Sequence, residues 1–271
     1  MQSSASLNNC HELTRQLVLV TGLTALLWGF HLYARTLETG VLGVIWLGLA
    51  LVIARGLFWR ARIRRRAWLQ VYVRPGSAWR HWLRGGVVMA LVRWLLGLLL
   101  AALLLLVLVR RDQPLFWQLL LLSGPLLIAL RVGWERLAAR DFQPGYRQEL
   151  VWSLSLRVAG ATLLLALVWL FFHQPQPDLT GASLAQALWH YVDQEQARSA
   201  WLEGALQAMA AKEGLQFWLA QHLVSVPGAH WLGQLLLWLL LFAEQALFVG
   251  AWLLVFNGII IKGQRYADPA S

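Results

Sequence analysis

Six apolar stretches, each about as long as a bilayer is thick, are the sequence feature that most constrains the fold. A membrane-spanning helix needs roughly 20 mostly apolar residues. The stretches that meet this requirement are approximately residues 17–33, 41–58, 86–109, 115–132, 150–172 and 231–261. Because lipid offers no hydrogen bonds to an exposed backbone, apolar runs of this length cross a membrane as helices. The sequence therefore predicts an all-α, polytopic membrane protein.

The charge and tryptophan content supports a surface that faces lipid. Only 13% of the residues are charged, about half of the ~25% that is usual for soluble domains. Such a chain has too few charges to cover a water-exposed surface of its size. It also contains 17 tryptophans, a residue that concentrates at membrane interfaces because its ring is buried while its N–H stays hydrated. The lipid bilayer is therefore the expected surroundings of most of the chain.

The placement of arginine predicts the direction of insertion. Residues 59–85, between the second and third spans, contain no acid and eight arginines: Arg60, Arg62, Arg64, Arg65, Arg66, Arg74, Arg80 and Arg84. Residues 133–149 hold three further arginines beside three acids, and the tail 262–271 holds Lys262 and Arg265; the positive-inside rule counts lysine and arginine and not net charge. With six spans, these segments share one side with residues 1–16, and the positive-inside rule makes that side cytoplasmic. We expect a multi-pass protein of the cell inner membrane, with both termini in the cytoplasm.

Residues 174–230 form the one sizeable segment expected outside the cytoplasm, between a five-span region at 17–173 and the sixth span. The segment is acidic, with Asp178, Asp193, Glu195, Glu203 and Glu213 against Arg198 and Lys212. Apolar residues recur in it at helical spacing from Leu184 onward, and Gly214 is expected to end a first amphipathic helix before a second one begins. We expect two or three helices that lie on the outer leaflet or on the ends of the spans, where they pack on the bundle or dock a partner.

A weak internal similarity links the second and fourth spans. Residues 51–54 read Leu-Val-Ile-Ala, and residues 126–129 read Leu-Leu-Ile-Ala at the same place in the later span. With a short deletion, Arg93 in the third span matches Arg157 in the fifth. The matches suggest that one helical hairpin was duplicated. Parallel repeats of this kind occur in transporters. Chance matching between leucine-rich helices explains them equally simply.

Ionisable residues inside spans are costly and are candidates for function. Arg93 and Arg157 lie near the cytoplasmic ends of their spans, where an arginine can extend its head group to the interface. Glu244 lies near the middle of the last stretch, so it must be protonated, paired or facing a polar cavity. The same stretch carries three further polar residues: Gln234, Gln245 and Asn257. We expect Glu244 to pair with Arg93 or Arg157, either to set helix register or on a transport path.

The basic segment 59–85 alternates arginine with tryptophan and tyrosine. Such a pattern can stack nucleic-acid bases, but it also suits a helix at an anionic leaflet, which attracts each arginine by about 1 kcal/mol. Because the adjacent spans hold the segment at the membrane surface, we expect anionic lipid of the cytoplasmic leaflet as its partner and no nucleic acid. A cytoplasmic protein partner is the other reading.

Sequence motifs for common enzyme chemistries are absent. The chain has no phosphate-binding loop of the Walker type and no HExxH, CxxC or GxSxG motif. Its single cysteine, Cys10, has no metal-ligand spacing. We therefore expect no catalytic residue, no metal and no cofactor. The leading expectation is a non-enzymatic scaffold or subunit of a membrane assembly with protein partners, ahead of a transporter component and an intramembrane enzyme that acts on lipid.

Overall fold

The computed structural model describes residues 2–72, 87–141, 144–175, 177–179, 181–225 and 231–260. These residues form one short 3₁₀ turn, η1, and eight α-helices, with no strand among them. The bounds in chain order are α1 (Gln2–Tyr33), η1 (Ala34–Thr36), α2 (Thr39–Tyr72), α4 (Val87–Arg110), α5 (Pro114–Asp141), α6 (Pro144–Phe172), α7 (Leu184–Val192), α8 (Ala200–Ser225) and α9 (Trp231–Ile260).

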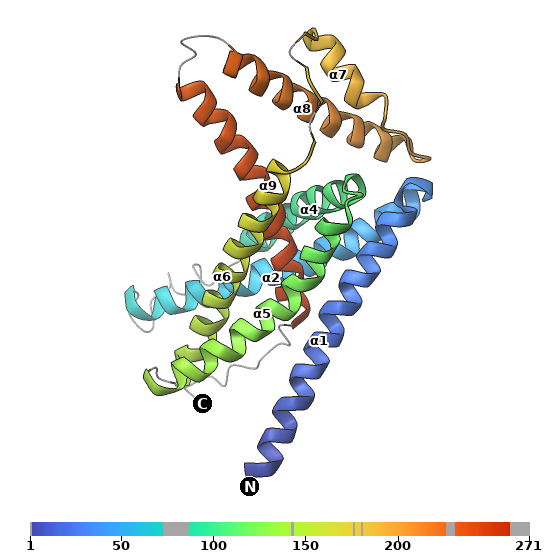
Figure 1. Ribbon diagram of the computed structural model, residues 1–271. Coiled ribbons are helices and arrows are strands. Elements are labelled where there is room, and N and C mark those ends of the chain that lie inside the picture. The colour runs from blue at the N-terminus through green and yellow to red at the C-terminus, as the bar shows by residue number, and fades with distance from the viewer. Residues whose placement is uncertain are drawn as a thin grey trace.

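Six of these helices contain a stretch that is long and apolar enough to span a membrane. The candidate spans are His11–Thr36, Thr39–Phe58, Val87–Arg110, Pro114–Ala138, Leu150–Phe172 and Trp238–Ile260. The all-α, six-span class predicted from the sequence is therefore confirmed. Figure 1 shows the spans crossing as a bundle, with α7 and α8 lying together beyond one of its ends.

The helices extend further than the apolar stretches that predicted them. α1 begins at Gln2, so most of the polar segment 1–16 is helical, and α2 continues to Tyr72, well into the basic segment that was expected to be a loop. α5 and α6 likewise take up most of residues 133–149. Hydrophobicity ends where a helix leaves the apolar phase, but the backbone hydrogen-bond ladder does not need to end there.

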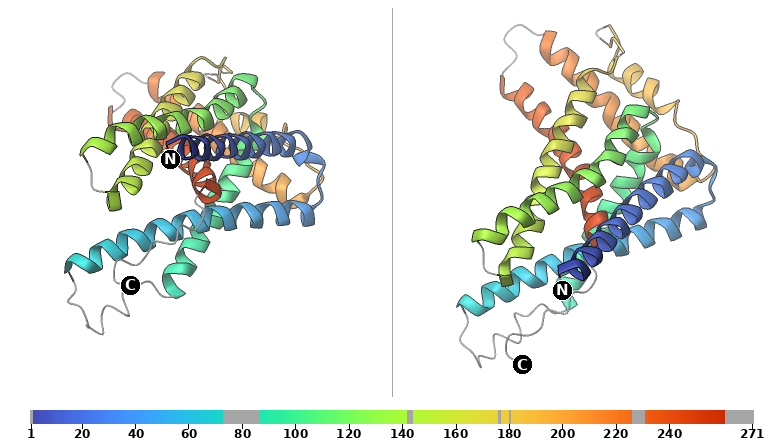
Figure 2. Two further views of the ribbon diagram at one scale, coloured as in Figure 1. Left: turned by 90° about the horizontal axis from the view of Figure 1, so that it is seen from below. Right: turned by 60° about the horizontal axis from the view of Figure 1, so that its bottom comes forward.

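The last helix forms the centre of the bundle. α9 packs against α2, α4 and α6 and contacts α1 and α8 as well, and Figure 2 shows it among these helices in two further views. In its final third, Trp252 and Phe256 are completely buried. The core of the protein is therefore built around the part of α9 farthest from α8.

Two glycines lie directly against the backbone of a neighbouring helix. A Cβ added at Gly258 on α9 would lie 2.3 Å from the carbonyl oxygen of Val52 on α2, and one at Gly97 on α4 would lie 2.8 Å from that of Ala50. Small residues draw membrane helices together because dispersion contact replaces the hydrophobic effect as the source of attraction. The α2–α9 and α2–α4 contacts therefore depend on these two positions.

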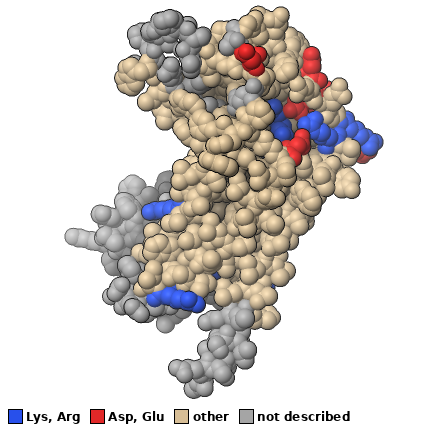
Figure 3. Space-filling model, viewed as in Figure 1, with Lys and Arg blue, Asp and Glu red and all other residues tan. Residues whose placement is uncertain are grey.

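A group of charged side chains lies at one end of the face drawn in Figure 3. Figure 3 shows acidic and basic groups gathered near α7 and α8 on this face, above a broad surface with few charges over the spans. We call α7 and α8 the cap, and the six spans the bundle. The charged groups lie where the cap meets the bundle.

Candidate functional site

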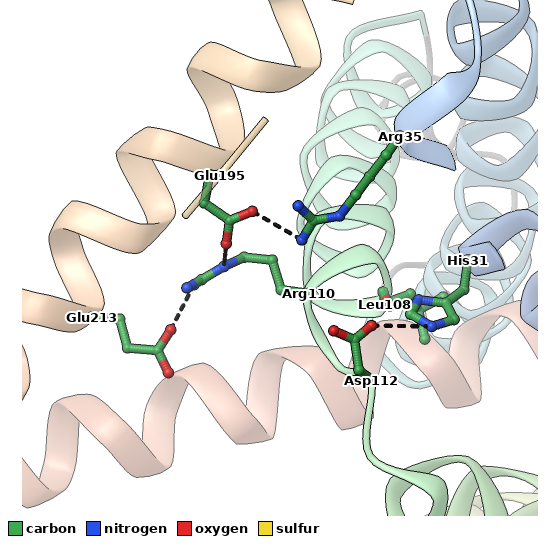
Figure 4. Close-up of polar contacts among 7 residues, drawn as sticks. All are labelled: His31, Arg35, Leu108, Arg110, Asp112, Glu195 and Glu213. Carbon is green, nitrogen blue, oxygen red and sulfur yellow. Dashed lines mark hydrogen bonds and ion pairs between the residues drawn. The ribbon is translucent and has the colours of Figure 1, made fainter. Parts of the chain in front are cut away.

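Arg110, the last residue of α4, links the cap to the bundle. Its Nε donates to Oε1 of Glu195 at 2.8 Å, and its Nη1 lies 2.6 Å from Oε2 of Glu213 on α8. Glu195 in turn lies 3.0 Å from Nη2 of Arg35 in η1. Figure 4 shows the four side chains converging from α4, η1, α8 and the segment between the cap helices. We call Arg35, Arg110, Glu195 and Glu213 the charge cluster.

The charge cluster is largely shielded from water. The Glu195 and Arg110 side chains are only 8% and 15% exposed, while Arg35 is the most exposed member at 38%. A guanidinium group suits this place because its planar fork can bind two carboxylates at once and stays ionised. The cluster therefore fixes the geometry between four chain segments.

The turn between α1 and α2 is held to the cap by further contacts beside the cluster. The backbone N–H of Arg198 donates to the carbonyl of Arg35 at 2.9 Å, and the hydroxyls of Thr39 and Ser199 are 2.8 Å apart. Ser199 precedes the first residue of α8, and Thr39 is the first residue of α2. The start of α8 thus lies level with the start of the α2 span.

Tyr191 on α7 borders the cluster from the cap side. Burial and, to a lesser extent, the negative charge of Glu213 raise the pKa of its phenol to about 12. Its hydroxyl is buried and has no hydrogen-bond partner among the described residues, and its ring is nearly parallel to that of Phe217 on α8. Tyr191 is therefore held in the neutral form by packing.

Glu244 pairs with Lys212 of α8. The expectation that it pairs with Arg93 or Arg157 is wrong, because both arginines lie toward the other ends of their spans. Glu244 is only six residues into the span that begins at Trp238, about 9 Å from that end at 1.5 Å per residue. Glu244 therefore lies near the cap end of the bundle and not at its middle. At the cap end, α8 supplies the cation.

The two intramembrane arginines are separate from this site. Arg93 on α4 is half-buried, and its Nε atom is buried without a partner among the described residues. Arg157 on α6 is exposed on the surface of the bundle. The α2–α4 and α5–α6 hairpins both pack closely, but a duplication of the hairpins stays a prediction.

Asn257 is the polar residue of α9 that reaches the core. It is fully buried, and its Oδ1 accepts a hydrogen bond from the indole N–H of Trp152 on α6, while its Nδ2 has no partner among the described residues. Gln245 is half-buried. The side chains of Gln234 and of the eight arginines between Arg60 and Arg84 lie outside the described residues.

Gly214 lies inside α8, so the expectation that it ends a helix is wrong. A Cβ there would lie 3.0 Å from the carbonyl of Ala187 and 3.0 Å from Cδ2 of Tyr191. The close approach of α7, and not a turn, accounts for this glycine. Sequence reasoning read it as a helix stop because glycine favours both situations.

His31 ties α1 to the end of α4 next to the cluster. Its Nδ1 is 2.9 Å from the carbonyl oxygen of Leu108, and its Nε2 is 3.4 Å from the carboxylate of Asp112. The Leu108 carbonyl belongs to the last turn of α4, where helix carbonyls lack intrahelical partners. Figure 4 shows His31 and Asp112 beside Arg110. The sequence did not lead us to His31 or to the charge cluster. The arginines at the span ends and the acids in residues 174–230 have opposite charges, and this could have predicted ion pairs between them.

The described residues offer little for ligand chemistry. They contain no group of three or more histidine, cysteine or acidic side chains that could hold a metal ion. They form an open pocket of 480 Å³ lined by Arg35, Gln196, Ala197, Arg198 and Glu203. The fold and this site together define a multi-span helical membrane protein with a cap fastened to its bundle. No protein-family model matches the chain, and neither a curated protein nor a solved structure matches it.

Proposed function

We propose that the chain is a non-enzymatic integral scaffold or subunit of a multi-component assembly in a bacterial-type inner membrane. The observation that carries this proposal is that adjacent residues of α8, Lys212 and Glu213, form ion pairs with two different spans. These ion pairs hold the cap in one position on the bundle. A fixed surface is what a docking protein needs, whereas the paired charges are not free to do chemistry.

The free polar surface of the cap lies on α7. Glu195 and Glu213, two of the five acids expected to attract a partner, are used inside the charge cluster. Trp189, His190 and Asp193 stay exposed on or just after α7. Exposed tryptophan is common at the centres of protein interfaces, so α7 is the proposed docking face.

A transport path through Glu244 is the second reading and has less support. Lys212 already neutralises Glu244, and the open pocket beside Arg35 does not include it. A substrate would have to displace Lys212 from α8 to use the carboxylate. An enzyme that acts on lipid has no support from a specific contact.

The proposed orientation places the cap outside the cytoplasm and both termini inside. The C-terminal parts of α2 and α5 carry arginines and lie away from the cap (Figure 1), which agrees with the positive-inside rule. At that end we propose contact between the arginines of residues 59–85 and anionic lipid. Reporter fusions after residue 271 and at Gln194 test the two sides.

Co-purification in native lipid tests the scaffold. The chain, extracted from its own membrane in polymer nanodiscs, should be heavier by native mass spectrometry than its 30.7 kDa plus lipid. Trp189→Ala on α7 should lose the added mass, while Trp201→Ala, an equally large change at another exposed cap tryptophan, should keep it. Recovery of the unmodified chain alone, both in nanodiscs and in mild detergent, would contradict the proposal.

A further inference from the structure

The helix α8 exposes apolar residues and holds several of its polar ones against the structure. Glu213 joins the charge cluster and Gln216 is buried, while Lys212, whose side chain stays partly exposed, reaches Glu244. Between Ala200 and His222 every α8 residue that is exposed is apolar or small, namely Ala200, Trp201, Gly204, Ala208 and Leu215. A surface helix in water shows the opposite arrangement.

The exposed residues form one flank. Positions 201, 204, 208 and 215 are separated by three, four and seven residues, which places them on a single stripe of a helix. A Cβ added at Gly204 would meet no atom within 4 Å, so nothing in the described structure covers the stripe there. We call these four residues the α8 flank.

The flank lies close to the cap ends of the spans. The ring of Trp201 is 6.3 Å from the ring of Trp46, which is within the α2 span. Further along α8, Lys212 reaches Glu244 inside the α9 span. Both contacts place the edge of α8 at the level of the outermost turns of the bundle.

The flank also continues a surface that faces lipid. Near Trp46, Val44 and Leu47 of the same span are 72% and 49% exposed. Trp201 is 73% exposed although its ring is beside Trp46. An indole at this depth is in its preferred place, with the ring in the apolar phase and the N–H near the head groups.

We propose that α8 is an interfacial helix whose flank, formed by Trp201, Gly204, Ala208 and Leu215, binds the lipids of the adjacent leaflet. The apolar stripe gains by leaving water, as in helices that lie in the plane of a membrane. Glu213 and Lys212 of the same helix are paired with Arg110 and Glu244 of the bundle. The same helix is therefore held by lipid on one side and by Arg110 and Glu244 on the other.

Spin labelling separates lipid from water and from protein. Cys10 is the only cysteine, so a Cys10→Ser background accepts Ala208→Cys on the flank and Gln194→Cys, which is exposed between the cap helices. Each labelled protein is reconstituted into phosphatidylglycerol–phosphatidylethanolamine vesicles. The collision rates of the nitroxide with oxygen and with a water-soluble nickel chelate are then measured.

We expect the ratio of oxygen to nickel accessibility to exceed one at position 208 and to fall below one at position 194. A ratio at position 208 equal to that at position 194 would overturn the proposal, because the flank would then face water. Shielding from both reagents would overturn it in favour of a protein contact. If Ala208→Cys does not fold, Leu215→Cys tests the same flank with the same outcomes.

Discussion

Lys212 and Glu213 are consecutive residues of α8, yet their side chains bind different spans, Glu244 of α9 and Arg110 of α4. Neighbouring residues on a helix point about 100° apart. One helix can therefore connect two spans only if it lies across their ends. This position makes α8 the part of the cap that is fastened to the bundle, and it leads to testable consequences.

The Lys212–Glu244 pair can be broken by replacing either residue, and the two replacements should lower the free energy of unfolding by different amounts. Lys212→Met leaves a half-buried carboxylate without its cation, whereas Glu244→Gln leaves a lysine that can extend into water. We expect Lys212→Met to cost more, with a coupling energy of about 1 kcal/mol between the two sites. A double-mutant cycle on unfolding in detergent measures it. Additive single effects would show that the pair contributes nothing.

Removing Arg110 should be far more damaging than removing a surface arginine. Arg110→Ala leaves Glu213 without its cation and leaves Glu195 with Arg35 alone, and loss of one partner from a buried pair costs about 3–5 kcal/mol. Arg198→Ala is the control, because Arg198 and its partner Glu38 are 65% and 68% exposed, and surface pairs contribute about 0–1 kcal/mol. Thermal unfolding and hydrogen exchange of α8 report both. Equal losses would contradict a structural charge cluster.

The Tyr191 phenol should make stability fall at high pH. Its pKa is about 12 in the folded protein, against an ordinary value of 10. The folded state therefore binds the proton more tightly, and its stabilising effect is complete below pH 10 and is lost as the pH rises toward 12. Tyr191→Phe should remove that part of the pH dependence.

At neutral pH, Tyr191→Phe should be neutral or stabilising, because it deletes a buried hydroxyl that has no partner among the described residues. Thermal unfolding of both proteins across this pH range gives the result. A large loss of stability at pH 7 in the phenylalanine variant would show that the hydroxyl is hydrogen-bonded.

Gly214 should tolerate no side chain, although it lies inside a helix. Gly214→Ala places a Cβ against Ala187 and Tyr191, and overpacking of this kind costs about 1–3 kcal/mol. Gly204→Ala on the same helix meets open space and should stabilise by up to about 1 kcal/mol through helix propensity. Melting temperatures of the two variants should move in opposite directions. If both melting temperatures moved in the same direction, α7 would have to lie farther from α8 than the structure places it.

The α2–α9 contact can be tested by a similar pair of changes within α9. Gly258→Ala meets the carbonyl of Val52, whereas Gly250→Ala meets no atom within 4 Å. The first should destabilise by about 1–3 kcal/mol and the second should leave the bundle intact. Unfolding in detergent and the yield of folded protein in membranes measure the difference. Unchanged stability of Gly258→Ala would show that the two helices are not in close contact.

Some of this structure could be predicted because it depends on local composition. Transfer of an apolar helix into lipid is a property of each segment, so the six spans were recognisable one by one. The helical character of the segment 174–230 followed from spacing in the same way, but its division at Gly214 did not, because α8 continues through that residue. The limits of α1, α2, α5 and α6 did not, because a helix continues past the apolar phase without a change in hydrophobicity to mark its end.

What the sequence determined by itself was therefore the class of fold: a membrane protein of six helices with an acidic helical segment before the last. The tertiary structure decided which charges meet. Arg110 and Glu195 are 85 positions apart, and pattern reasoning offered Glu244 only the arginines within the spans and not Lys212 on the cap. The physical reason is that an ion pair depends on the packing of whole helices. Here that packing places α8 across the ends of α4 and α9, so acids that were expected to face water are paired inside the protein.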